Sequence, residues 1–177
     1  AGLVQKKDVS EIVTKNIGLY SIACIMYLVC GFLVMYPGDA TIIDGVLPEF
    51  SLASLGLSTT LPNEEIGIPY GMAYSQQADF FFQVVFVATA MSIVSGAVAG
   101  RMKLVPFFLF AVVLTGAIYP IQGYWNWGEG FLYQMGYSDY AGSGTVHLCG
   151  AAAALAVVLV LGPRKGKYAA DGTSLPM

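Results

Sequence analysis

The residue that most clearly suggests chemistry is His147, the only histidine in the chain. It lies five residues into a charge-free run at residues 142–162. An ionisable side chain within such a run is costly to bury, so it usually has a function. Neutral imidazole can both donate and accept hydrogen bonds. His147 therefore either packs by hydrogen-bonding a neighbouring helix or lines a pore.

Two other polar residues lie in or beside apolar runs. Asp139 precedes the run that contains His147, and we expect its carboxylate to cap a helix N-terminus. From that position it could also bias a nearby cation site. Gln83 lies between Phe82 and Val84 in a second run. We expect it to make an interhelical hydrogen bond, with a direct role in a site as the alternative.

Three aromatic residues could form a cation site. Phe82 and Phe86 are four residues apart and so share one helical face. Trp127 is expected at the membrane surface. Core packing is the usual explanation of such a phenylalanine pair, and an interfacial aromatic belt is the ordinary explanation of the tryptophan. If the three rings converge, their faces would make a cation–π site for a small cation.

No motif points to hydrolytic or redox chemistry. The sequence contains no Cys/His metal spacing, phosphate-binding loop, dinucleotide fingerprint or Ser/His/Asp arrangement. All three cysteines, Cys24, Cys30 and Cys149, fall inside apolar runs, where small side chains pack between helices. We therefore expect a protein that is not an enzyme and needs no metal, cofactor or nucleic acid.

The elements that must position these residues are membrane helices. The chain is 56% hydrophobic and only 11% charged, whereas about 25% is usual for soluble domains. Four charge-free runs of about twenty residues cover residues 17–36, 80–99, 104–123 and 142–162. A helix of that length matches a hydrocarbon core of roughly 30 Å. The prediction is an all-α polytopic membrane helix bundle with four transmembrane helices.

Charge distribution predicts the orientation. All eight lysines and arginines lie before the first run, between the second and third, or after the fourth. The connections at residues 37–79 and 124–141 contain only acidic charges. Basic residues favour the cytoplasmic side, so both chain ends are expected in the cytoplasm. The long 37–79 connection is expected to fold over the outer surface.

Small residues and prolines predict how the helices pack and bend. Gly96 with Gly100, and Gly150 with Ala154, have the spacing that lets helix backbones approach closely in a membrane. Pro120 is expected to kink or end the third helix near the outer face.

Three segments resemble the ammonium transporter/Rh family. They are DFFFQVVFV (79–87), YPIQGYWNWGEGF (119–131) and SDYAGSGTVHLCGAAAALA (138–156); AGLVQKKD (1–8) and GPRKGKY (162–168) resemble the family's cytoplasmic connections. The resemblance covers essentially the whole chain. It implies a homotrimer in the cell membrane, with two inverted five-helix repeats in each subunit. Residues 1–177 would be a single partial transmembrane domain, roughly the N-terminal half, with the second to fifth helices.

The resemblance also implies roles for individual residues. Phe82 and Trp127 resemble walls of an outer recruitment site, and Phe86 resembles one ring of the gate beneath it. His147 resembles the first of two pore histidines, and Asp139 the aspartate that orders the backbone of the site. Ammonium would bind to the rings, lose a proton and cross as ammonia. The remaining half of the fold would be a required partner, together with the lipid bilayer.

One local departure and two other functions stay open. Glu129 stands where the family commonly has glycine, adding a negative charge at the outer mouth. The chain could instead belong to an ammonium-sensing membrane domain, or to a non-transporting membrane subunit in which His147 and the aromatic residues only pack.

Overall fold

The computed structural model describes residues 5–50 and 76–175. In chain order the elements are η1 (Lys6–Asp8), α1 (Val9–Met26), η2 (Tyr27–Gly31), α2 (Phe32–Met35), β1 (Thr41–Ile43), β2 (Leu47–Pro48), α3 (Gln76–Ala97), α4 (Leu104–Val113), η4 (Leu114–Ile118), α5 (Tyr119–Asn126), α6 (Phe131–Gln134), η5 (Ser143–Leu148) and α7 (Cys149–Leu161). Segment η1 is a 3₁₀-helix, whereas η2, η4 and η5 are π-helical turns.

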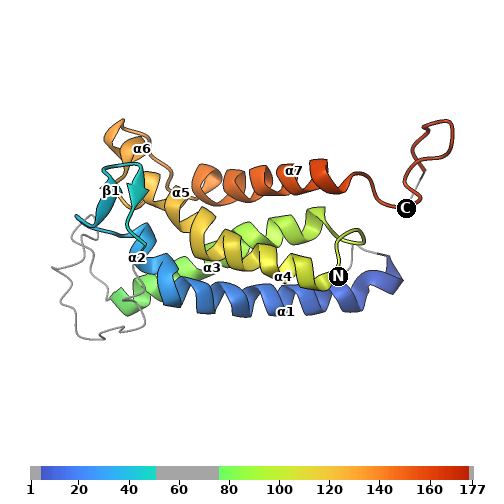
Figure 1. Cartoon of the computed structure of the whole chain (residues 1–177), viewed down its shortest axis with the longest axis horizontal. Coiled ribbons are helices and arrows are strands. Elements are labelled where there is room, and N and C mark those ends of the chain that lie inside the picture. Colours follow the sequence, from blue (N-terminus) through green and yellow to red (C-terminus); the bar gives the residue numbers. More distant parts are fainter. Residues whose placement is uncertain (1–4, 51–75, 176–177) are drawn as a thin grey trace.

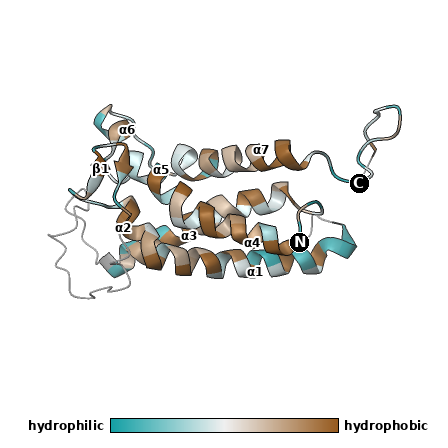
Figure 2. Cartoon of the chain, in the orientation of Figure 1, coloured by the Kyte–Doolittle hydropathy of each residue, from teal (hydrophilic) through white to brown (hydrophobic). Residues whose placement is uncertain are grey.

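Four helices in the described chain are long and apolar enough to cross a membrane, which confirms the expected all-α polytopic membrane bundle. They cover Lys6–Met35, Gln77–Ala97, Leu104–Gln134 and Ser143–Leu161. Hydrophobic residues dominate the middle of the helices, whereas hydrophilic residues concentrate near the ends (Figure 2). The bundle therefore has the polarity of a membrane protein.

The first helix begins well before the apolar run that predicted it. It includes Glu11 and Lys15, and the Lys15 side chain is fully buried. The ammonium group of Lys15 pairs with Glu11, donates to the Met102 carbonyl at 2.7 Å and lies 5.2 Å from the centre of the Phe107 ring. These partners compensate for burial of the charge, so the helix extends beyond its apolar part.

The third helix does not end at Pro120. Its α-helical turns change to the π-helical turn η4 at Leu114–Ile118, and α5 begins at Tyr119 with Pro120 in its first turn. Proline has no N–H and tolerates the start of a helical segment. The expected distortion is thus present, as a π turn within a helix that continues to Asn126.

Only one of the two small-residue pairs brings helices together. A Cβ atom on Gly150 would lie 2.7 Å from the Ala90 carbonyl oxygen, so α7 packs closely on α3 at this point. Gly96 has no neighbour of this kind within 4 Å, and Gly100 has a φ of +69° in the turn after α3. The Gly96–Gly100 pair therefore serves a turn in the described chain, contrary to the prediction.

The start of η1 and the end of α7 lie at the same end of the bundle, which we call the terminal end (Figure 1). Two arginines join the helix ends there. Arg101 Nη1 donates to the Gly162 carbonyl at 2.6 Å, and Arg164 Nε donates to the Ala99 carbonyl at 2.9 Å. Cations at helix C-termini satisfy carbonyls that lack helical partners. Burial, together with the nearby Arg164 charge, lowers the pKa of Arg101.

The opposite end of the bundle carries the antiparallel β1–β2 hairpin and α6, and we call it the hairpin end (Figure 1). Trp125 and Tyr124 attach the hairpin to α5: Trp125 Nε1 donates to the Val46 carbonyl at 2.8 Å, and the Gly45 amide donates to the Tyr124 hydroxyl at 2.9 Å. The expected fold of the rest of the 37–79 connection, residues 51–75, lies outside the described residues.

Candidate functional site

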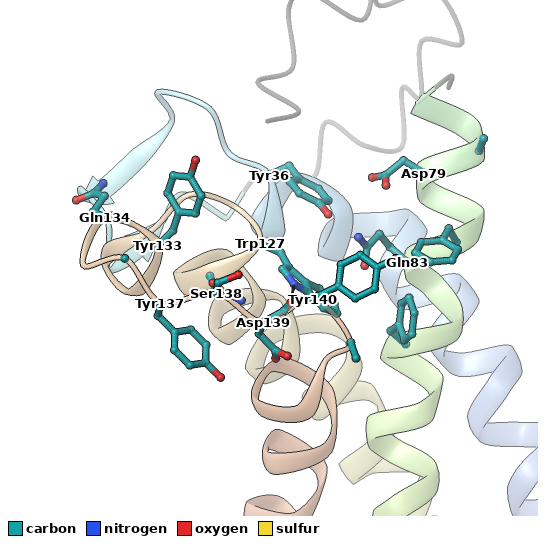
Figure 3. Close-up of a pocket in the computed structure, with 16 residues that line it drawn as sticks. Tyr36, Asp79, Gln83, Trp127, Tyr133, Gln134, Tyr137, Ser138, Asp139 and Tyr140 are labelled. Carbon is teal, nitrogen blue, oxygen red and sulfur yellow. Dashed lines mark hydrogen bonds between the residues drawn. The ribbon is translucent and has the colours of Figure 1, made fainter. Parts of the chain in front are cut away.

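A cavity of about 1310 Å³ opens at the hairpin end between α3, the end of α5 and the segment after α6 (Figure 3). Its walls combine aromatic rings with a few polar side chains. They include Phe82, Gln83, Phe86, Asn126, Trp127 and Asp139. A concave apolar pocket with a few convergent polar groups is the usual form of a small-molecule site.

The three aromatic residues singled out in the sequence converge on this cavity. The ring centres of Phe82 and Phe86 are 5.0 Å apart at an interplanar angle of 82°. The centre of Phe86 lies 5.7 Å from that of Trp127, at 60°. Phe82 is 58% exposed, whereas Phe86 and Trp127 are partly buried against the core. The three rings therefore form one cluster, packed edge to face, at the wall of the cavity.

The indole of Trp127 is fixed by the segment before η5. Its Nε1 donates to the backbone carbonyl of Asp139 at 2.7 Å. Gly128, the next residue, leaves no room for a side chain, since a Cβ there would lie 2.0 Å from the Met35 carbonyl oxygen. Trp127 therefore cannot turn freely, and its ring stays against the cavity.

Asp139 caps the start of the fourth helix, as predicted. Its carboxylate accepts from the amides of Ser143 at 2.9 Å, Gly144 at 2.9 Å and Thr145 at 2.7 Å. Partial burial raises the pKa of Asp139, but hydrogen bonds from Thr145, Ser143 and Gly144 outweigh it, so the pKa lies below its usual value. The carboxylate is therefore ionised and held by backbone donors.

Sequence reasoning missed two residues that support this turn. Asn126 Nδ2 donates to the Thr145 hydroxyl at 3.3 Å. The Gln122 amide, oriented so that both its ends are satisfied, donates to the Thr145 carbonyl at 2.7 Å. Both residues come from α5 and are four positions apart, so they share a helical face. That spacing of two amides in an apolar segment was the available signal.

Among the residues that the structure describes, Gln83 does not make the expected interhelical hydrogen bond. Gln83 is 8% exposed and lines the cavity, but its Oε1 has no hydrogen-bond partner among the described residues. The helix α3 turns the amide toward the cavity, because Gln83 shares a face with Phe86 and Phe82.

His147 lies outside the cavity, on the exposed side of η5. Its Nδ1 is 3.1 Å from the carbonyl oxygen of Gly142, within its own turn. That contact favours the tautomer with hydrogen on Nδ1, which leaves Nε2 as an acceptor. In the described chain His147 makes no hydrogen bond to a neighbouring helix.

Glu129 adopts a backbone conformation that favours glycine. Its φ is +66°, and it is the one residue other than glycine with positive φ in the described chain. The side chain is exposed and does not line the cavity. A left-handed conformation costs about 1 kcal/mol for a residue other than glycine. This cost is a physical reason why glycine would be common at this position in the family that the sequence resembles.

The fold and these features define a polytopic helical membrane protein with a cavity walled by aromatic rings at one end. Comparison with known proteins narrows this class. The Ammonium Transporter Family matches residues 1–177. The chain belongs to that family.

Several relatives align along almost the whole chain. A Synechocystis sp. relative is 39% identical over 95% of the chain and 36% of its own length. The ammonium transporter Amt2 of Archaeoglobus fulgidus is 36% identical over 97% of the chain and 36% of its own length. Amt2 of Haloferax mediterranei is 34% identical over 98% of the chain and 36% of its own length. The chain thus spans about a third of the length of these relatives.

Proposed function

We propose that this chain contributes to transport of ammonium or ammonia across the cell membrane, by supplying a cation-recruiting cavity and part of a pore wall. The observation that carries the proposal is the convergence of Phe82, Phe86 and Trp127 on one cavity. Ring faces attract a small cation by about 2 kcal/mol or more where water is partly excluded. Curated relatives named ammonium transporters support the choice of cation.

Deprotonation follows from the cost of carrying a full charge into an apolar channel. Ammonium can release a proton and continue as neutral ammonia, whereas potassium cannot. Asp139 is a poor proton acceptor because three backbone amides already hold its carboxylate and its pKa is lowered. Its role is to hold the turn and, through its own carbonyl, the Trp127 indole.

His147 is the residue we assign to the pore. Its Nε2 is directed away from the Gly142 contact and can accept a proton or a hydrogen bond from the passing molecule. The exposed face that carries it would be covered by the remaining part of the transporter fold. On this proposal the protein is a trimer of inverted-repeat subunits, with both ends of this chain in the cytoplasm.

Substitution of Trp127 tests this function. Radiolabelled methylammonium uptake is measured in proteoliposomes that hold the native gene product with any partner it purifies with. Trp127→Leu should raise the half-saturation concentration about tenfold or more, since 1.4 kcal/mol corresponds to a factor of ten. The matched control is Trp125→Leu, which removes an indole that binds the Val46 carbonyl outside the cavity. Equal effects of the two substitutions would contradict the proposal.

A further inference from the structure

Helix α3 presents a continuous stripe to the cavity. Asp79, Phe82, Gln83 and Phe86 follow the i, i+3, i+4, i+7 spacing of a single helical face, and all four line the cavity. The two phenylalanines belong to the aromatic wall described above. Asp79 and Gln83 have no role in the proposed function, although they occupy the same wall.

Both polar residues of this stripe are buried. Asp79 is 2% exposed and Gln83 is 8% exposed, and the Oε1 atom of Gln83 has no hydrogen-bond partner among the described residues. Figure 3 shows Asp79 and Gln83 on the same side of the cavity as Tyr36. A buried amide acceptor without a partner is unfavourable in the empty cavity, so a ligand that donates to it would be favoured there.

The electrostatic setting favours a positively charged ligand. The chain carries no lysine or arginine between Lys15 and Arg101, or between Lys103 and Arg164. The segments that build the hairpin end therefore contribute carboxylates and no basic side chains. A cleft lined by one sign of charge raises the local concentration of ions of the opposite sign.

We propose that Asp79 and Gln83 form a polar subsite of the cavity that takes a small monovalent cation with N–H donors, such as ammonium or methylammonium. This inference rests on the proposed transport function and adds a second set of ligands to it. The carboxylate attracts the charge, and the Gln83 oxygen accepts one N–H. The aromatic rings then receive the cation from the adjacent turn.

The spacing along α3 suits such a transfer. Four residues of α-helix rise about 6 Å and three rise about 4.5 Å, so Asp79, Gln83 and Phe86 stand at successive levels of one wall. Ammonium has four N–H donors directed to the corners of a tetrahedron. It can therefore keep one bond to Gln83 while another N–H reaches the ring face of Phe86 or Trp127.

The test compares two glutamines on the same helix. Gln83→Leu removes the amide while keeping a similar volume, and Gln77→Leu makes the same change at an exposed position outside the cavity. Methylammonium uptake is measured in proteoliposomes of the native gene product. Gln83→Leu should raise the half-saturation concentration about tenfold, because a hydrogen bond to a charged group is lost, and leave the maximal rate within about twofold. Gln77→Leu should change neither.

Asp79→Asn provides a second variant with nearly unchanged shape. It should raise the half-saturation concentration at least as much as Gln83→Leu, because the buried carboxylate that attracts the cation is replaced by a neutral amide. Thermal unfolding of each purified variant shows whether it is folded. If Gln83→Leu unfolds at a lower temperature and loses uptake altogether, Gln83 is a structural residue and the subsite is wrong.

Different results would overturn the Asp79–Gln83 subsite and the transport function. Unchanged half-saturation in both Gln83→Leu and Asp79→Asn, with Trp127→Leu still impaired, overturns the subsite and leaves the transport function intact. No methylammonium uptake by the unsubstituted protein overturns the transport function, and the subsite with it.

Discussion

Replacing Asp139 with asparagine tests the central turn of the site. The Asp139 carboxylate accepts three backbone N–H bonds, one on Oδ1 and two on Oδ2. Asparagine keeps a single acceptor oxygen and places an NH₂ group against the remaining amide. At a simple helix N-cap, Asp and Asn stabilise about equally. The substitution therefore distinguishes an ordinary cap from a carboxylate that needs both oxygens.

The magnitude follows from the bonds that change. A hydrogen bond to a charged acceptor contributes about 1.5–3 kcal/mol, and a neutral acceptor roughly half as much. Asp139→Asn loses at least one bond and weakens the others. Because Asp139 is partly exposed, solvent reduces these values. We expect the free energy of unfolding to fall by about 2 kcal/mol at neutral pH.

The same carboxylate gives stability a specific dependence on pH. The pKa of Asp139 is lower in the folded protein than its usual value of about 3.9, so the ionised form favours folding. Its contribution is fully present above that value and is lost as the pH falls through the folded-state pKa. The difference between the unsubstituted protein and Asp139→Asn should therefore be constant from about pH 5 to 8 and shrink in more acidic buffer.

Denaturant unfolding of the purified protein in mild detergent, followed by tryptophan fluorescence, measures both effects. Asp171→Asn is the matched control, since hydrogen bonds from Thr173 also lower the pKa of Asp171, in an exposed loop away from the cavity. It should leave the unfolding midpoint unchanged. If Asp139→Asn falls within about 0.5 kcal/mol of the unsubstituted protein, the carboxylate acts only as an ordinary cap and the reasoning is refuted.

Three further predictions concern single residues. Gly150→Ala should destabilise the protein by about 1–3 kcal/mol, because the new Cβ would lie 2.7 Å from the Ala90 carbonyl oxygen. Gly96→Ala should be neutral or stabilising, because no neighbour lies within 4 Å of the new Cβ. Chemical denaturation measures the free energy of unfolding of both variants. Glu129→Gly should raise the free energy of unfolding by about 1 kcal/mol by removing strain at φ +66°, and Glu129→Ala, which keeps the strain, should not. His147→Ala should abolish methylammonium uptake while the protein still assembles, because the pore imidazole is lost; loss of assembly instead would support a packing role.

Several features could be predicted from local sequence because a single helix determines them. The four apolar runs define the four long helices, and the four-residue spacing of Phe82 and Phe86 places both rings on one face of α3. Asp139 caps the start of η5 because it shortly precedes an apolar helix. Each of these depends on residues close together in the chain.

The contacts between helices could not be predicted, partly because three π-helical turns change their phase. A π turn contains about one residue more than an α turn, so side chains after it are rotated by about 100° relative to an unbroken α-helix. Segment η4 precedes Gln122 and Asn126, and η5 contains Thr145 and His147. A helical wheel drawn from the sequence therefore misplaces the side chains that meet between α5 and η5.

One glycine links the two parts of the candidate site. Gly142, with φ +78°, offers its carbonyl oxygen to the amides of Val146 and His147 at 2.9 Å and to the His147 ring at 3.1 Å. A Cβ on Gly142 would lie 3.2 Å from the Trp127 ring. The same turn contains Asp139, whose carbonyl accepts the hydrogen bond from Trp127, and Gly142, whose carbonyl orients the His147 imidazole. The aromatic wall of the cavity and the exposed histidine, although on different sides of the turn, share a single backbone support.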